Sequence, residues 1–400
     1  MNPRLTLLLA VAAGVIVANL YYAQTLVGPI SQSTGISADA AGLIVTLTQV
    51  GYCLGLLFIV PLGDRIENRK MIVTGLVVTA AALVLAALAT SAVAFLAAAL
   101  LIGLGAVVAQ VLVPFAAHLS PEASRGQTVG KVVSGLLIGI MLARPLASLI
   151  ADVAGWHTVF GLAAVSLVAL AVLLQFKLPT REPASTHRYP QLLASLWHLF
   201  RTTPVLRRRA AYHAALFGAF SLFWTTAPLI LASDRFALSQ TEIALFALVG
   251  MAGAVASPVA GKLADGGHSR SATGAALLLG VLAFVVALLA PVSRPVALAC
   301  MVAASIVLDM AVAANLVLGQ RAIYMLGAEV RSRLNGLYFA LFFAGGAVGS
   351  SAGGWLQARH GMHGAMLGGL LLCALGLAYW LTELRPARAK DPLCVGDVSA

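Results

Sequence analysis

Long apolar runs alternate with short polar stretches along the whole chain. Each run approaches or exceeds the roughly 20 apolar residues that a helix needs to cross the bilayer core. The pattern therefore predicts an all-α membrane protein with twelve transmembrane helices. They are expected at about residues 5–30, 40–62, 71–91, 93–118, 129–153, 157–177, 210–232, 241–263, 271–291, 295–319, 334–356 and 362–382.

The longest polar stretch divides these runs into two sets of six. We expect an N-terminal half at 1–178, a linker at 179–209, a C-terminal half at 210–384 and a disordered polar tail at 385–400. In the linker, Leu192, Leu193, Leu196, Trp197 and Phe200 recur at helical spacing. This spacing indicates either an amphipathic helix on the membrane surface or a solvated loop helix.

Two segments of the first half have similar counterparts in the second half, which indicates that the second half repeats the first. Pro61–Lys70, between the second and third runs, has a counterpart in Gly261–Arg270, and Arg125–Gly130 has one in Arg331–Gly336. Each segment occupies the same place in its half as its counterpart does. The halves are therefore predicted to be parallel repeats of six helices each.

Composition excludes a soluble enzyme, because 60% of the 400 residues are apolar and 10% charged, against about 45–50% and 25% in soluble domains. The net charge of +11 comes from Lys and Arg that gather in the segments on one side of the predicted membrane. This bias predicts that both termini are cytoplasmic in the inner (plasma) membrane of a bacterium, and it does not indicate nucleic-acid binding. We interpret the first run as an uncleaved helix, because further spans follow it.

Other chemistry finds little support. The four cysteines, at positions 53, 300, 373 and 394, have no paired spacing, so neither a disulfide framework nor a metal site is predicted. No P-loop motif and no metalloprotease motif occur in the sequence. We therefore expect no ATP hydrolysis, no cofactor and no membrane-embedded enzyme.

The loop between the second and third runs carries a family resemblance. A motif of the form G-x-L-a-D-R-x-G-R-R/K matches at Leu62, Asp64, Arg65 and Arg69, and departs at Val60, Glu67 and Asn68. The second copy keeps Gly261, Leu263, Ala264 and Asp265. With twelve spans in two halves, the whole chain resembles the major facilitator superfamily. Asn19–Gln24, Leu308–Met310 and Gln320-Arg321 are most similar to its drug, sugar and nucleoside efflux branch, the arabinose-efflux-permease-like transporters.

This resemblance implies a secondary transporter in which two halves rock around a midplane site. It also implies that Asp64, Arg65 and Arg69, with Gly261 and Asp265, form a cytoplasmic gate that latches the halves. A simpler interpretation of the loop cations is topology signalling alone.

Two ionisable residues lie inside predicted spans, where each costs at least about 2.5–3.5 kcal/mol. Arg144 lies about halfway along the fifth span and Asp309 about halfway along the tenth. In the fold that the chain resembles, the fifth helix packs near the eighth and tenth, so contact is expected. We interpret Asp309 as the proton-coupling carboxylate and Arg144 as its partner or an anion-binding group. The alternative is a static ion pair that holds the halves in register.

The fifth span keeps a proline, Pro145, but Arg144 and Ser148 stand where efflux antiporters of this superfamily often carry glycines. Small residues at four-residue spacing still permit close helix packing.

Single polar residues on the first, fourth, seventh and tenth spans are candidates for the substrate cavity that those helices line in the resembled fold. Asn315 lies about 240° around its helix from Asp309, so the two are not expected to share one narrow site. The alternative is that these side chains only make hydrogen bonds between helices. The candidates are Asn19, Tyr22, Gln24, Gln110, His213, Trp224 and Asn315.

The leading hypothesis is a monomeric, proton-coupled exporter of a small organic solute or drug, with the solute, protons and the lipid bilayer as its partners. An importer or facilitator on the same fold is the first alternative, and a lipid flippase is the second. The sequence sets neither direction nor substrate.

Overall fold

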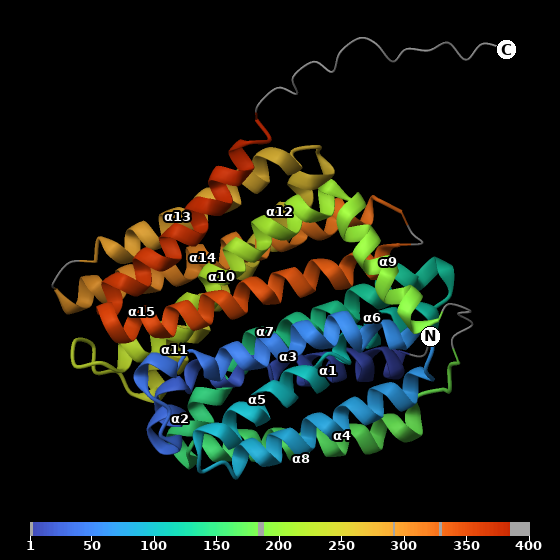
Figure 1. Cartoon of the computed structure of the whole chain (residues 1–400), viewed down its shortest axis with the longest axis horizontal. Helices are drawn as coiled ribbons and strands as arrows, with labels where there is room; N and C mark the ends of the chain where they lie inside the picture. Colours follow the sequence, from blue (N-terminus) through green and yellow to red (C-terminus); the bar gives the residue numbers. More distant parts are fainter. Residues whose placement is uncertain (1–2, 183–187, 291–292, 328–329, 385–400) are drawn as a thin grey trace.

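The computed structural model describes residues 3–182, 188–290, 293–327 and 330–384, and the predicted tail at 385–400 lies outside this range. The described residues form helices and no strand. Figure 1 separates the long helices into two bundles, with α1 and α3–α8 in one and α10 and α13–α15 in the other. The division coincides with the two predicted halves.

The N-terminal half contains helices of quite different lengths, several of which combine into one span. Its elements are α1 (Pro3–Ala18), η1 (Tyr22–Thr25), α2 (Val27–Thr34), η2 (Ala38–Ala40), α3 (Leu43–Phe58), η3 (Val60–Asp64), α4 (Asn68–Ala87), α5 (Ala92–Ala106), α6 (Ala109–His118), η4 (Glu122–Ser124), α7 (Arg125–Ala154) and α8 (Trp156–Lys177).

The linker contributes α9 (Tyr189–Thr202). The C-terminal half then contains α10 (Pro204–Ala232), α11 (Gln240–Gly250), η5 (Met251–Val255), α12 (Ala256–Asp265), α13 (Ser269–Leu288), α14 (Arg294–Tyr324) and α15 (Arg331–Leu381).

The predicted number of twelve spans is compatible with these helices. In the described part of the chain, ten helical stretches are long and apolar enough to cross a membrane, and Pro3–Ala18 is a shorter apolar helix. The last of the ten contains two spans, because Gly361 breaks α15 with φ 59° and ψ −159°. A φ of this sign is adopted readily by glycine and rarely by other residues.

Four predicted spans are not continuous α-helices. The first breaks after Ala18, the second between α3 and η3, the fourth between α5 and α6, and the eighth at η5. At the first break, the Asn19 amide donates to the carbonyl oxygens of Val15 and Ile16, at 2.8 and 3.0 Å. A side chain that binds the preceding turn competes with the helix ladder. The remaining spans begin and end within a few residues of their predicted limits.

Close glycine contacts pair α1 with α7 and α10 with α15. Gly139 packs on the backbone of Gly14, and Gly349 packs on the backbone of Gly218. One turn earlier, Gly135 packs on Ala10, just as Gly345 packs on Ala214. The expectation of close packing along the fifth span is confirmed, and the same geometry recurs in the other half.

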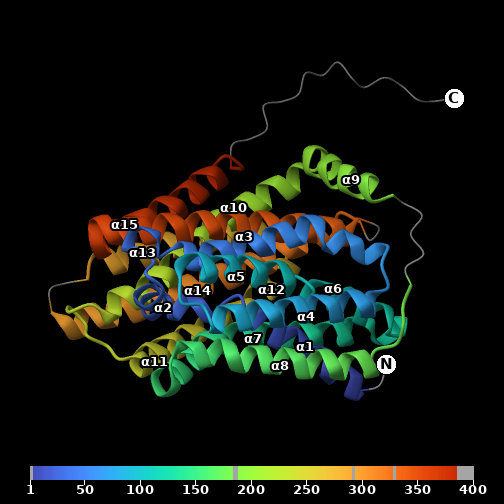
Figure 2. The ribbon, with the colours of Figure 1, turned by 60° about the horizontal axis from the view of Figure 1, so that its bottom comes forward.

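The bundle has two ends, which we name after a helix and a residue that lie there. The α9 end holds α9, η3 and the N-terminus, and Figures 1 and 2 show α9 crossing this end beside the long helices. The Arg359 end holds η2 and the turn at Gly361. On α9, Leu196 is buried against Leu334 and Leu337 of α15, whereas Trp197 is exposed. Much of the apolar stripe of α9 therefore packs on protein.

Candidate functional site

Arg144 and Asp309 meet between the two halves. Nη2 of Arg144, on α7, donates to Oδ2 of Asp309, on α14, at 3.4 Å. The exposed fraction of the side chain is 2% for Arg144 and 11% for Asp309. Opposite charges that leave water together reduce each other's desolvation cost. The expected contact between these two residues is therefore present in the structure.

Trp224 of α10 completes the cluster. Its indole N–H donates to Oδ1 of Asp309 at 3.0 Å. The guanidinium carbon of Arg144 lies 3.8 Å from the centre of the Trp224 ring and 5.3 Å from that of Phe220. A cation over an indole face is stabilised by the ring quadrupole. The sequence nominated Trp224 for the substrate cavity, and the structure joins it to the ionisable pair.

The surrounding backbone holds the cluster at close range. The Thr25 hydroxyl of η1 donates to the Arg144 carbonyl oxygen at 3.3 Å. A methyl group added at Gly250 would lie 2.9 Å from the Trp224 ring, and one added at Gly253 would lie 2.6 Å from Cβ of Asp309. The broken eighth span therefore brings its backbone against both Trp224 and Asp309.

Arg144 keeps unused hydrogen-bonding capacity. Its Nε and Nη1 have no hydrogen-bond partner within the described part of the protein, although the side chain is buried. Buried donors without a partner carry a desolvation cost. Each of these two nitrogens can donate a hydrogen bond to an additional acceptor.

The three candidates from the first span do not lie on one helical face, because the helix ends before them. Asn19 and Tyr22 were expected to share a face, but Asn19 closes α1 and Tyr22 begins η1. Gln24 is fully buried, and neither of its side-chain polar atoms has a partner among the described residues. Of the three, Gln24 has the strongest requirement for an additional partner.

The other nominated residues pack within the halves. Gln110 donates to the Tyr52 hydroxyl at 3.1 Å. His213 lies fully buried, with Nδ1 hydrogen-bonded to the Tyr338 hydroxyl. Asn315 is 2% exposed, and its Nδ2 has no partner in the described ranges. No hydrogen bond links these three residues to Arg144 or Asp309 in that part of the chain.

Two polar pairs that the sequence did not reveal bridge the halves. Gln49 of α3 donates to the Ser221 hydroxyl of α10 at 2.7 Å. Thr46 of α3 lies 2.8 Å, oxygen to oxygen, from the Ser350 hydroxyl of α15. All four side chains are buried. In the sequence, Thr46 and Gln49 are visible as two polar residues one helical turn apart in an apolar run. This pattern is too common to identify a contact between the halves.

At the α9 end, the gate loop is held mainly within the N-terminal half. Glu67 replaces a motif glycine, and its carboxylate accepts from the backbone N–H groups of Arg69 and Lys70, so it caps α4. The Arg69 guanidinium donates to the Leu178 carbonyl oxygen at 3.4 Å. Arg65 is exposed.

Asp64 faces charges from both halves. Its carboxylate interacts electrostatically with Arg333 of α15, with Arg181 of the linker and with His118. Burial lowers the pKa of the Arg181 guanidinium, and Asp64 opposes that shift. The Arg181 side chain also donates to Asn68 at 2.7 Å. Within the described residues, Asp64 is the nominated gate residue of the first half that has an electrostatic partner in the second half.

The second copy of the motif forms an ion pair inside the C-terminal half. The Arg321 guanidinium of α14 pairs with Asp265 and also donates to the Gly261 carbonyl oxygen at 3.4 Å. These contacts join the ends of α12 and α14. They brace one half, and they do not by themselves cross to the other.

At the Arg359 end, polar contacts join the halves on both sides of the bundle. Arg359 binds Asp39 through Nε and Nη2, at 3.2 and 3.1 Å. The Thr241 hydroxyl of α11 donates to Asp152 of α7 at 2.6 Å. The Arg359 end is therefore closed by contacts of η2 with α15 and of α7 with α11. Among the described residues, no three His, Cys, Asp or Glu side chains are grouped as a metal site would require.

The fold and the pair between its halves are those of a membrane transporter of two six-helix repeats. A family model of the Major Facilitator Superfamily matches residues 9–328, and the chain belongs to this superfamily. The resemblance of the chain to this superfamily is thereby confirmed.

Known proteins support the same classification. The uncharacterized transporter YgaY of Escherichia coli O157:H7 is 38% identical over 382 residues, which are 95% of each chain. The purine ribonucleoside efflux pump NepI of Salmonella paratyphi A is 22% identical over 267 residues, 66% of this chain and 65% of NepI. The crystal structure of a bacterial homolog of the human lysosomal transporter Spinster, inward-facing and unoccupied, has a TM-score of 0.75 at 14% identity, and covers 96% of this chain and 97% of that one. The protein is therefore a transporter and not an enzyme.

Proposed function

We propose that this protein is a proton-coupled exporter of a small organic solute. The observation that supports the proposal is the buried contact of Arg144 with Asp309, which joins the halves. Buried ionisable groups in membrane proteins commonly mark ion and proton pathways.

The pair can couple protonation to movement through its charge balance. When Asp309 is ionised, it neutralises Arg144 and favours contact between α7 and α14. When a proton binds Asp309, the attraction is lost and Arg144 becomes an uncompensated buried cation, which is costly. A solute whose donor group binds the ionised carboxylate would compete with the proton. Competition of this kind is what exchange of the solute for protons requires.

Export is the direction that we favour, for one reason outside the geometry. A relative, NepI, is named as an efflux pump, and the same direction is proposed here for a small organic solute or drug. The positive-inside bias of the sequence assigns the α9 end to the cytoplasm. With that orientation, the contacts Asp39–Arg359 and Asp152–Thr241 close the outer side of the inner membrane.

An importer that uses the same pair is the second candidate function. Asp309 has the larger exposed fraction of the two, 11% against 2%, so the proton could enter or leave from either side as the halves rock. Nothing in the geometry of the pair sets the direction of net flux.

The test uses the full-length protein and Asp309→Asn in proteoliposomes, with a solute chosen by thermal stabilisation of the purified protein. We expect the wild type to move the solute against its gradient when a pH gradient is imposed. Asp309→Asn should show weaker solute counterflow, because its amide lacks the negative charge, and it should lose the response to pH. Transport by Asp309→Asn that is still driven by the pH gradient would refute the coupling role. Imposing the pH gradient in each direction in turn distinguishes export from import.

A further inference from the structure

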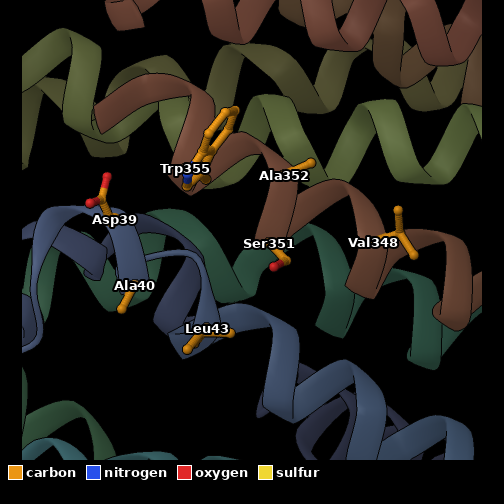
Figure 3. A pocket seen from close by; sticks show the side chains of 7 residues that line it. All are labelled: Asp39, Ala40, Leu43, Val348, Ser351, Ala352 and Trp355. Atoms are coloured by element: carbon orange, nitrogen blue, oxygen red, sulfur yellow. The ribbon is translucent and has the colours of Figure 1, made fainter. Parts of the chain in front are cut away.

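An apolar groove lies at the Arg359 end, on the seam between the halves. Figure 3 shows side chains from both halves around it: Asp39, Ala40 and Leu43 from the start of the second span, and Val348, Ala352 and Trp355 from α15. The groove has a volume of about 560 Å³. Its two walls therefore belong to parts of the molecule that must separate if this end opens.

The groove faces away from the protein interior. Gly346 of α15 packs on Gln49 at the centre, and Trp355, nine residues later, lies about 180° around the helix. The exposed fractions of Val348 and Trp355 are 62% and 46%. Both belong to a stretch long and apolar enough to cross the membrane. Exposed apolar side chains on such a span are covered by acyl chains.

A cation stands at the outer limit of the groove. Arg359 lies one turn beyond Trp355, and its guanidinium carbon is 5.9 Å from the centre of the Trp355 ring. Asp39 accepts from Nε and Nη2 of this guanidinium, and no other described residue accepts from Nη1. Tryptophan and arginine together are typical of the depth of lipid headgroups. An apolar channel that ends at the Arg359–Asp39 pair matches an acyl chain in shape, and Nη1 of Arg359 can donate to the phosphate of a lipid headgroup.

Polar contacts immediately inside the groove close the seam. Thr46 and Ser350 share a hydrogen bond of 2.8 Å, and a methyl group at Gly354 would lie 2.7 Å from the Gly42 Cα. A chain that lies across both walls adds apolar contacts only while these pairs remain together. Such a ligand stabilises the closed arrangement, and closure must in turn strengthen its binding.

We propose that the groove binds an acyl chain of a phospholipid, with the phosphate at Arg359, and that the bound lipid holds the Arg359 end closed. The proposal does not depend on proton coupling or on the direction of transport.

Trp355 provides a direct measurement of binding. The full-length protein is reconstituted in phosphatidylcholine containing phosphatidylglycerol brominated on its acyl chains, and the emission of Trp355→Phe is subtracted from that of the wild type. The control is Val165→Trp, which adds an indole at a position on α8 that is 67% exposed and far in sequence from the groove. Trp355 should be quenched at a lower mole fraction of brominated lipid than position 165. A ratio of about fivefold is the upper limit expected from one arginine near an anionic headgroup, because Asp39 offsets part of the charge of Arg359.

Two variants test the cause of this enrichment. Ala352→Leu fills the groove, and Arg359→Gln removes the cation. Either variant should bring the quenching of Trp355 to the level at position 165. Equal quenching at the two positions in the unmodified background would overturn the proposal. Absence of quenching at Trp355, as when a second copy of the chain covers the groove, would overturn it as well.

The effect on closure is measured by a disulfide between Thr46→Cys and Ser350→Cys in a background with serine at the four native cysteines. Removing phospholipid with detergent should lower the yield of this disulfide. Adding phosphatidylglycerol should restore the yield in the protein that keeps the native Ala352, but not in the variant that also carries Ala352→Leu. A yield that does not respond to phospholipid would overturn the conformational part of the proposal.

Discussion

Gly253 lies against Asp309 so closely that a methyl group at position 253 would come within 2.6 Å of the Asp309 Cβ. It would also lie 2.6 Å from the Met310 backbone nitrogen and 2.7 Å from the Ile306 carbonyl oxygen. Backbone atoms cannot rotate out of the way as a side chain can. The eighth span therefore fixes the place of Asp309 through a residue that carries no functional group.

We expect Gly253→Ala to impair transport through a shift of Asp309. Overpacking of this kind typically costs about 1–3 kcal/mol of stability, so the protein should still fold while its proton-driven rate falls sharply. Gly161→Ala is the matched control, since a methyl group there meets nothing within 4 Å, and it should be neutral or slightly stabilising in a helix. The measurements are thermal unfolding and proton-driven uptake in vesicles. If both variants transport equally, the contact with Gly253 does not position Asp309.

Removing one charge of the buried pair should destabilise the protein, and removing both should not. Arg144→Met leaves Asp309 as an unpaired buried carboxylate, which we expect to cost about 3–5 kcal/mol. The double variant Arg144→Met with Asp309→Leu should recover most of this loss when unfolding is followed by heating in detergent. Both variants should fail to transport against a gradient. Uphill transport by the double variant would mean that the pair is a static contact between halves.

Trp224→Phe should change the pH dependence of transport. The variant keeps an aromatic ring beside Arg144 but removes the N–H that donates to Asp309 at 3.0 Å. That donor binds the ionised carboxylate, so its removal changes the balance between the ionised and the protonated side chain. A hydrogen bond to a charged group contributes about 1.5–3 kcal/mol, so the pH profile of the proton-driven rate should differ from that of the wild type. An unchanged profile with a lower rate throughout would indicate that Trp224 has only a packing role.

Joining Thr46 to Ser350 should trap the closed Arg359 end. Oxidation of the protein with Thr46→Cys and Ser350→Cys is expected to form a disulfide, because the two hydroxyl oxygens lie 2.8 Å apart. Transport should stop on oxidation and return on reduction, and each single cysteine variant should transport under both conditions. Continued transport by the fully crosslinked protein would show that the α3–α15 contact does not open during the cycle.

Much of the architecture follows from local composition. Twelve apolar runs, the repeated loops at Pro61–Lys70 and Gly261–Arg270, and the small residues of the fifth span depend on residue type and spacing alone. A helix in lipid must satisfy its backbone internally, so a long apolar run leaves few alternatives to a spanning helix. The superfamily and the two halves were therefore predictable before any coordinates were known.

Arg144 and Asp309 were also identifiable in advance, because a charge in an apolar run is expensive wherever it finally packs. Their contact was expected from the resembled fold, and the residues around them were not. Trp224 was nominated for a cavity, whereas Gln49, Thr46 and Ser350 were not nominated at all. Hydrogen bonds between helices depend on which helix faces meet. The position of a polar residue in one helix therefore does not predict its partner in another.

The sequence by itself determined that this protein is a two-half membrane transporter and which two buried charges require an explanation. Only the tertiary structure decided that Trp224 binds Asp309, that Gly253 presses against it, and that the Arg359 end is closed. The first group of conclusions depends on the free energy of each residue in lipid, which sequence specifies. The second depends on helix rotation and on small breaks such as η5, which are set by packing between segments far apart in the chain.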